Sequence, residues 1–253
     1  MKVFITGAST GIGAALARRY GGQENTLGLA ARRLDLLEAL AASLPANHSL
    51  FALDVADTQA VARAATEFVA RHGAPDLVIA NAGVSVGTHG DAIEDVAKLA
   101  RVMAVNLGGL AATLAAFAPA MMEAGHGTLC GIASVAGFRG LPGAGAYSAS
   151  KSAAITWLES LRAELHGSGV SVVTVCPGYV DTPLTRSNRY RMPFLLSADE
   201  FARRCARVIG ARRRLAVIPW QMAIVGSLLR AMPPWLYDRV AARAPRKSRD
   251  IAI

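Results

Sequence analysis

Residues 6–20 read TGASTGIGAALARRY, and this stretch decides the fold. It continues the apolar run KVFIT, and Gly7, Gly11 and Gly13 open a segment with helical apolar spacing. Glycines let the backbone turn sharply and approach a diphosphate, which the free N–H groups of the helix then bind. An ordinary glycine-rich turn is the alternative. The position between an apolar strand and a helix favours a nucleotide-binding strand–helix unit.

Apolar runs and helical patterns alternate along the rest of the chain. Strands are expected at residues 26–31, 49–55, 76–81, 127–134 and 170–178, and helices include 95–124 and about 146–166. Strands that alternate with helices pair in parallel through right-handed crossovers. The sequence therefore predicts an α/β, doubly wound Rossmann fold with a central parallel sheet and helices on both faces.

The chain shows no internal repeat and no low-complexity linker. We therefore expect one oxidoreductase domain over residues 1–253, in which 186–253 form a C-terminal helical lid over the substrate and a basic and apolar C-terminal segment. The first residues lead straight into a strand, so no signal peptide is expected. Three scattered cysteines fit no disulfide framework, which favours a cytoplasmic protein. Neither the cysteines nor the five histidines have metal-ligand spacing, so no metal site is expected.

The net charge of +9 is concentrated at the C-terminal end. Residues 186–253 contain 15 Lys and Arg against 4 Asp and Glu, whereas residues 1–185 contain 12 against 14. Such an excess suits an anionic lipid surface, an acidic protein or a nucleic acid, although a solvated arginine-rich face is the more common explanation. No nucleic-acid-binding module is recognisable, so no nucleic-acid partner is expected.

The end of the second expected strand indicates which dinucleotide binds. NAD is normally held there by an acidic residue, but the sequence reads LAARR, with Ala31 followed by Arg32 and Arg33. Arginine suits the 2′-phosphate of NADP, which a carboxylate would repel. NADP (NADPH) is therefore expected, with Arg32 the stronger candidate and Arg33 open to a purely solvated role.

Several short motifs appear in a fixed order: the glycine segment 7–13, Asp54-Val55, Asn81-Ala82-Gly83, Asn106, Ser134, Tyr147-x-x-x-Lys151 and Pro177-Gly178. Together they resemble the short-chain dehydrogenase/reductase family of the single-domain type, over roughly residues 2–185. One departure is Ala80, since the family has Asn-Asn-Ala-Gly where this chain has Ala-Asn-Ala-Gly. The order of the set is specific, although each motif alone is weak.

The resemblance implies four catalytic residues. Tyr147 would exchange a proton with the carbonyl or carbinol oxygen, and Ser134 would hydrogen bond to the same oxygen. Because Tyr147 and Lys151 are four residues apart on one helix, the lysine charge is expected to lower the tyrosine pKa. Lys151 would also hold the nicotinamide ribose, and Asn106 would anchor a water that relays protons to Lys151. Taken singly, each has a structural alternative: a turn serine, a core tyrosine, a polar asparagine inside a helix.

The resemblance also implies cofactor contacts, to which the two arginines are added. Asp54 and Val55 would meet the adenine, although Asp54 alone would also suit a turn, and Val180 and Thr182 would meet the nicotinamide carboxamide. The full expected set is Gly7, Ser9, Thr10, Gly11, Ile12, Gly13, Arg32, Arg33, Asp54, Val55, Asn81, Ala82, Gly83, Tyr147, Lys151, Pro177, Gly178, Val180 and Thr182.

The apolar segment from residue 215 to 236 carries Trp220 and Trp235 and is interrupted by prolines and Arg230. The interruptions argue against a membrane-spanning helix. Packing against the domain or a second subunit is the commonest role for such a segment; a hydrophobic lid and a helix in the membrane interface are the others. The segment suggests a hydrophobic, lipid-derived ketone or secondary alcohol, in lipid metabolism.

These observations predict an NADP(H)-dependent oxidoreductase that transfers hydride between nicotinamide and a carbonyl or secondary alcohol. Two alternatives stay open: a reductase of 3-oxoacyl groups on an acidic carrier protein, and a non-catalytic NADP-binding sensor or scaffold. By the resemblance, a homodimer or homotetramer is expected. The location expected is cytoplasmic, with peripheral contact at the inner membrane face through the basic segment.

Overall fold

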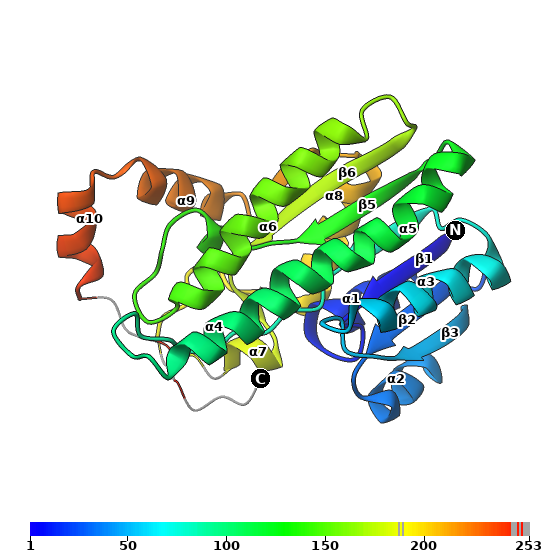
Figure 1. The fold of residues 1–253 in the computed structure, drawn as a ribbon, viewed down its shortest axis with the longest axis horizontal. Helices are drawn as coiled ribbons and strands as arrows, with labels where there is room; N and C mark the ends of the chain where they lie inside the picture. The colour runs from blue at the N-terminus through cyan, green and yellow to red at the C-terminus, as the bar shows by residue number, and fades with distance from the viewer. Residues whose placement is uncertain (187, 189, 244–246, 248, 250–253) are drawn as a thin grey trace.

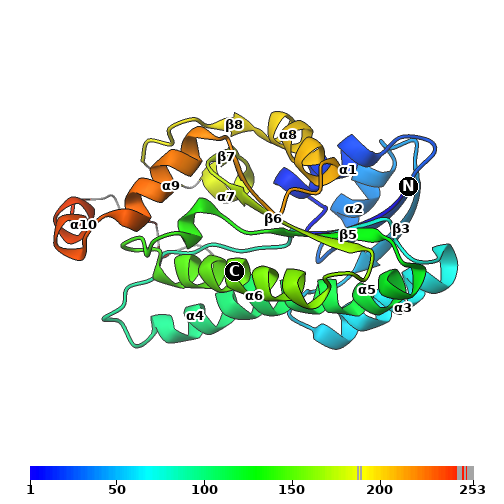
Figure 2. The ribbon, with the colours of Figure 1, turned by 90° about the horizontal axis from the view of Figure 1, so that it is seen from above.

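The protein is a layered α/β molecule with one extended end. The computed structural model describes residues 1–186, 188, 190–243, 247 and 249. In Figures 1 and 2 the parallel strands form a central layer between two layers of helices, and α9 and α10 project at one end of the long axis. Of the segment 186–253, residues 187, 189, 244–246, 248 and 250–253 lie outside the described part.

The strands of the main sheet are short and almost all apolar, as strands buried on both faces must be. They are β1 (Lys2–Thr6), β2 (Thr26–Ala31), β3 (Asn47–Ala52), β4 (Leu77–Ala80), β5 (Gly127–Ile132), β6 (Val170–Pro177) and β9 (Leu215–Ile218). Two short strands, β7 (Val180–Asp181) and β8 (Leu196–Ser197), pair separately.

Helices connect the strands in the alternating order that the sequence predicts. They are α1 (Gly11–Tyr20), α2 (Leu34–Ala41), α3 (Thr58–His72), α4 (Asp95–Met103), the π-helix η1 (Ala104–Gly109), α5 (Leu110–Ala124), the 3₁₀ turn η2 (Val135–Gly137), α6 (Gly145–Glu164), α7 (Pro183–Arg186), α8 (Ala198–Gly210), α9 (Gln221–Ala231) and α10 (Pro234–Ala241).

The strand order of the main sheet is β3-β2-β1-β4-β5-β6-β9, and every neighbouring pair is parallel. The chain runs outward from β1 in one direction to β3, and then returns to β4 on the other side of β1. In sheets of this topology a ligand binds where the direction reverses, at the carboxyl ends of the strands. The predicted doubly wound fold is confirmed, and it places the binding edge between β1 and β4.

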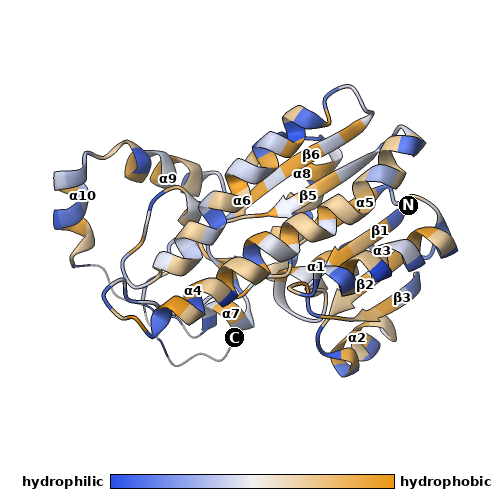
Figure 3. Cartoon of the chain, in the orientation of Figure 1, coloured by the Kyte–Doolittle hydropathy of each residue, from blue (hydrophilic) through white to orange (hydrophobic). Residues whose placement is uncertain are grey.

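Alternate residues of each strand build two cores, one on each face. Val3 and Ile5 point to the face that α1, α2 and α8 cover, where Phe201 is fully buried. Phe4 points to the opposite face, where its ring lies against Phe117 of α5 with centroids 4.6 Å apart. Figure 3 shows the strands as the most apolar layer of the molecule.

The long helix 95–124 is the one candidate membrane span among the described residues. Its most apolar 18-residue window has a mean hydropathy of 1.6, and its 30 residues are long enough for a span, but half of that window is buried inside the fold. Leu110, Leu114 and Phe117 of this helix are almost completely buried in the core beneath the sheet. The helix therefore packs as a core helix of this fold.

The expectation that 186–253 are wholly lid and C-terminal segment is wrong for residues 198–218. Helix α8 packs against α1 and buries Phe201 and Cys205, and β9 extends the main sheet beside β6. The apolar segment 215–236 is likewise not one helix. It begins as a sheet strand, and only α9 and α10 project beyond the sheet (Figures 1 and 2). The apolar strand β9 directly follows three arginines, so its sequence did not indicate a buried strand.

Candidate active site

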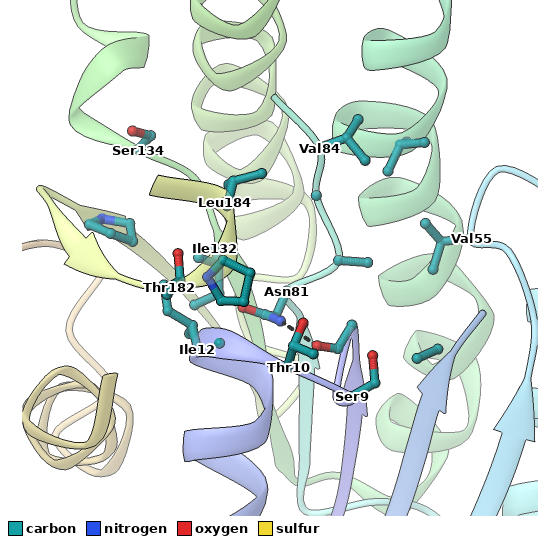
Figure 4. Close-up of a pocket in the computed structure, with 18 of the residues that line it drawn as sticks. Ser9, Thr10, Ile12, Val55, Asn81, Val84, Ile132, Ser134, Thr182 and Leu184 are labelled. Atoms are coloured by element: carbon teal, nitrogen blue, oxygen red, sulfur yellow. Dashed lines mark hydrogen bonds between the residues drawn. The ribbon is translucent and has the colours of Figure 1, made fainter. Parts of the chain in front are cut away.

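A cleft opens at the carboxyl ends of the strands, on both sides of the point where the strand direction reverses. It is lined by the β1–α1 turn, the ends of β2 to β6, one face of α6 and the segment around α7. Figure 4 shows side chains from the β1–α1 turn, from the segments after β3 and β4, from β5 and from the segment around α7. The predicted residues that line it are Gly7, Ser9, Thr10, Gly11, Ile12, Arg32, Arg33, Asp54, Val55, Asn81, Ala82, Gly83, Ser134, Tyr147, Lys151, Pro177, Gly178, Val180 and Thr182. Gly13 and Asn106 do not line the cleft and lie behind the residues that do.

The β1–α1 turn depends on its glycines for two different reasons. Gly7 and Gly11 have φ angles of 65° and 56°, a conformation that residues with a Cβ atom rarely adopt. Gly13 has an ordinary φ, but a Cβ atom there would overlap the carbonyl of Gly7, so it permits close packing of helix on strand. Thr10 precedes α1 without a side-chain cap, so the first N–H groups of this fully described helix face the cleft.

The β2 side of the cleft is positively charged. Arg32 and Arg33 are exposed at its edge, and no acidic residue stands at the end of β2. Asp54 lies after β3 and pairs with Arg101 of α4, whose Nη2 donates to its Oδ2. Burial opposes the charge on Asp54, but the Ala56 N–H and Arg101 outweigh it and hold the carboxyl pKa below its usual value. Arg101 also lines the cleft and was not predicted from the sequence.

The loop after β4 is held from both sides. The Nδ2 of Asn81 donates to the Thr6 carbonyl at 3.0 Å, and the Thr6 hydroxyl accepts from the Asn81 N–H at 3.1 Å. Asn106 is fully buried in the π-helix and exchanges two hydrogen bonds, of 2.8 and 2.9 Å, with the backbone of Val84. Its Nδ2 also donates to Ser150 of α6. Its observed contacts fix the loop, and the predicted water relay stays a prediction.

The catalytic candidates meet at the β5 and α6 side of the cleft. Lys151 is 4% exposed, and its Nζ donates to the Ile132 carbonyl at 2.8 Å. Burial lowers the pKa of Lys151 to about 8. Ser134 caps the turn η2 by accepting the Ala136 N–H at 3.1 Å and hydrogen bonds to Tyr147.

The pKa expectation for Tyr147 is wrong for this structure. Burial raises the pKa of the phenol, and this effect outweighs the hydrogen bond with Ser134, which lowers it. The Nζ of Lys151 lies 5.8 Å from the centre of the Tyr147 ring, and its proton is directed to a backbone carbonyl. The phenol therefore stays protonated at neutral pH, in the form that donates a proton.

A pair of tyrosines near the catalytic tyrosine was not predicted. Tyr179 and Tyr190 stack edge to face with ring centres 6.3 Å apart. Burial, followed by the neighbouring Tyr179 and Tyr147, raises the pKa of Tyr190 to about 12, which places Tyr190 close to the catalytic tyrosine. Leu184 of α7 lines the cleft. The two tyrosines lie in loops whose path no local pattern reveals.

The arrangement fits a nicotinamide dinucleotide. The uncapped start of α1 suits the diphosphate, the arginines beyond β2 suit a phosphate, and Gly83 leaves the space above Lys151 and Asn106 that a side chain would fill. Within the described residues, no group of three or more His, Cys, Asp or Glu side chains could hold a metal ion.

Comparison with known proteins gives a consistent result. The family model for short chain dehydrogenases matches residues 1–192. An oxidoreductase of Myxococcus xanthus is 36% identical over 94% of this chain and 95% of its own length. A short-chain dehydrogenase of Sphingobium yanoikuyae, solved with NADPH, is 26% identical over 92% of this chain and 96% of its own, with a TM-score of 0.77.

A short chain dehydrogenase of Mycobacterium paratuberculosis, solved with NAD, is 25% identical with a TM-score of 0.74, over 85% of this chain and 94% of its own. Similar proteins thus bind a nicotinamide dinucleotide, some NADPH and others NAD. The family match covers the glycine turn, the Asn81 loop and the Tyr147–Lys151 pair that build the cleft. The chain belongs to the short-chain dehydrogenase/reductase family and is an oxidoreductase.

Proposed function

We propose that the protein is an NADPH-dependent reductase of hydrophobic ketones, working in reverse as a secondary-alcohol dehydrogenase. The observation that carries this proposal is the joint position of Ser134, Tyr147 and Lys151 on one wall of the cleft that the β1–α1 turn opens. A protein that only binds a dinucleotide has no need of this set.

The positive charge at the end of β2, where the adenine ribose is expected, supports binding of NADPH. Arg32 and Arg33 stand where NAD-binding proteins carry an acid, and the nearest carboxylate, Asp54, is already paired with Arg101. A 2′-phosphate would therefore meet guanidinium groups and no free carboxylate.

The chain supplies the proton and the position of the substrate oxygen. NADPH, when bound, supplies the hydride that reduces the carbonyl carbon. Tyr147 donates its phenolic proton to the carbonyl oxygen, so a ketone gains one hydride and one proton and becomes a secondary alcohol. Ser134 orients the oxygen, and the Lys151 ammonium stabilises the phenolate that remains until solvent protonates it again.

The substrate wall supports an apolar substituent. Tyr190 lies close to Tyr147 and packs against Tyr179, and the exposed apolar side chains of Phe194 and Leu195 follow in the sequence. Such a surface gains about 0.8 kcal/mol for each substrate methylene group that it buries. The reaction rate is therefore expected to rise with ketone chain length.

The test is the rate of NADPH and NADH oxidation by the purified protein across a series of methyl ketones of increasing length. We expect kcat/KM to favour NADPH, to rise with chain length and to fall by roughly 10²- to 10⁴-fold in Tyr147→Phe. Arg32→Asp should reverse the cofactor preference, and Arg71→Asp, on an exposed face of α3, is the matched control. Binding of NADPH without turnover of any carbonyl would favour a sensor instead.

A further inference from the structure

The helices α9 and α10 carry a large apolar surface that nothing in the described structure covers. Trp220, Ile224, Leu228 and Trp235 are 64%, 53%, 64% and 69% exposed. The first three are spaced four residues apart, so they lie along one side of α9. Monomeric soluble proteins rarely leave large apolar side chains gathered in this way.

The opposite side of α9 is firmly seated on the rest of the molecule. Met222 packs at Gly178, at the end of β6, and Gly226 packs against the ring of Phe138. The α9–α10 face, defined as Trp220, Ile224, Leu228 and Trp235, is therefore the outward side of a packed element.

Contacts from α10 join this element to the active-site loop. The Tyr237 hydroxyl donates to the Gly140 carbonyl, and the Arg139 guanidinium lies 4.4 Å from the centre of the Tyr237 ring. Arg139 also donates to the Arg230 carbonyl at 3.2 Å. Residues 138–144 lead directly into α6 and Tyr147, so the α9–α10 element is attached to the rim of the substrate cleft.

The positive charge near the α9–α10 face indicates which kind of partner it binds. Residues 220–243, which include both helices, contain three arginines, Arg230, Arg239 and Arg243, and a single acidic residue, Asp238. Arg239 follows Trp235 by four residues on α10, so an arginine and a tryptophan share one side of that helix. Tryptophans beside arginines on an apolar face are characteristic of helices that lie in the interface of a bilayer with anionic lipids.

We propose that the α9–α10 face binds the surface of an anionic lipid bilayer, with its apolar side chains at the level of the acyl chains and its arginines among the headgroups. The position of these helices at one end of the long axis allows this contact without burying the sheet (Figures 1 and 2). The proposal stands whether or not the protein reduces ketones.

The experiment is flotation of the full-length protein with vesicles of phosphatidylcholine alone, or with about one third phosphatidylglycerol. We expect at least about tenfold stronger binding to the anionic vesicles, lost at high salt. The variant with Trp220→Ser, Ile224→Ser, Leu228→Ser and Trp235→Ser should bind at least about tenfold more weakly. Met122→Ser removes another exposed apolar side chain, 45% exposed, from α5 and should bind as the unchanged protein does.

The arginines are tested separately with Arg230→Gln and Arg239→Gln, which together should weaken binding to anionic vesicles by roughly tenfold or more. Unchanged thermal unfolding and NADPH binding verify that each variant is folded. A fluorescence blue shift on adding vesicles, in protein carrying Trp157→Phe, would report entry of Trp220 and Trp235 into the interface.

Three results would overturn the proposal. They are equal binding to neutral and anionic vesicles, binding to soluble poly-glutamate as strong as to vesicles, and no vesicle binding at all. In the last case, an oligomer that the four-serine variant dissociates would assign the face to a second copy of the chain. Poly-glutamate binding would assign it to an acidic protein.

Discussion

Burial makes Lys151 the group whose charge changes nearest to neutral pH in the active site. Its side chain is almost completely enclosed, and its pKa falls to about 8, whereas burial raises the pKa of Tyr147. The two shifts have the same physical origin, because a dry site disfavours a charged lysine and a charged phenolate alike. The active site therefore holds a neutral phenol, Tyr147, beside a lysine ammonium, Lys151, that gives up its proton easily.

The pH dependence of kcat/KM for ketone reduction should decrease above about pH 8. The charged form of Lys151 is the one that stabilises the phenolate, and it is lost as the pH rises through the pKa. Lys247 is the matched control, because burial lowers its pKa to about 8 as well, and Lys247→Met should leave this decrease in place. A decrease that begins only above pH 10 would assign it to Tyr147.

Removing Arg101 should weaken cofactor binding. Its guanidinium pairs with Asp54, and both side chains are about one third exposed, so the loss is modest. We expect Arg101→Gln to raise the Kd for NADPH by roughly two- to tenfold, because Asp54 loses its partner and its fixed position. Isothermal titration measures the effect, with Arg71→Gln on α3 as the control. A Kd equal to that of the control would contradict it.

The sequence predicted the residues whose type is required by the chemistry or by the backbone. Gly7 and Gly11 are required by their φ angles, and Tyr147 and Lys151 by their spacing on one helix. It missed Arg101 and Tyr190, because an arginine in a helix and a tyrosine in a loop carry no local sign of what they face. The expected direction of the Tyr147 pKa was wrong because burial, which depends on the whole fold, raises the pKa and outweighs the hydrogen bond with Ser134.

Helices and strands could be predicted from the sequence where the spacing of apolar residues and the length of the segment indicated the same kind of element. The helix 95–124 and the strand 170–177 lie within a residue of their expected limits. The sequence predicts lid where the structure has helix α8 and strand β9, because α8 carries arginines on its outer side and β9 has only four residues. Their burial follows from contact with α1 and β6, which lie far away in the sequence.

Helix α8 should depend on its N-terminal cap. The Ser197 hydroxyl accepts the Glu200 N–H at 3.2 Å and satisfies one of the free donors of the first turn. We expect Ser197→Ala to lower the free energy of unfolding by about 1 kcal/mol, measured with urea. Ser152→Ala, on the exposed side of α6, should change it by less than about 0.5 kcal/mol. An equal effect of the two substitutions would argue against the cap.

The whole molecule should unfold as one unit that includes residues 198–218. Phe201 is completely buried between α8 and the sheet, so Phe201→Ala should cost about 3–5 kcal/mol. Phe194→Ala, at a ring that is 49% exposed, is the control and should cost much less. In urea, tryptophan fluorescence and NADPH binding should be lost together in Phe201→Ala. Loss of α8 alone, with NADPH still bound, would show that this segment unfolds separately.

The π-helix Ala104–Gly109 also determines which side chains the middle of the long helix presents to its neighbours. A π-turn holds one residue more than an α-turn, so deleting one residue there would close it into an α-turn, which would keep α4 and α5 in register but move the side chains within the turn around the helix axis. Asn106 would then leave Val84 and Ser150. In related sequences, segment 104–109 should therefore keep its length even where its residue types change. Deleting one residue there should reduce activity more than most single substitutions do.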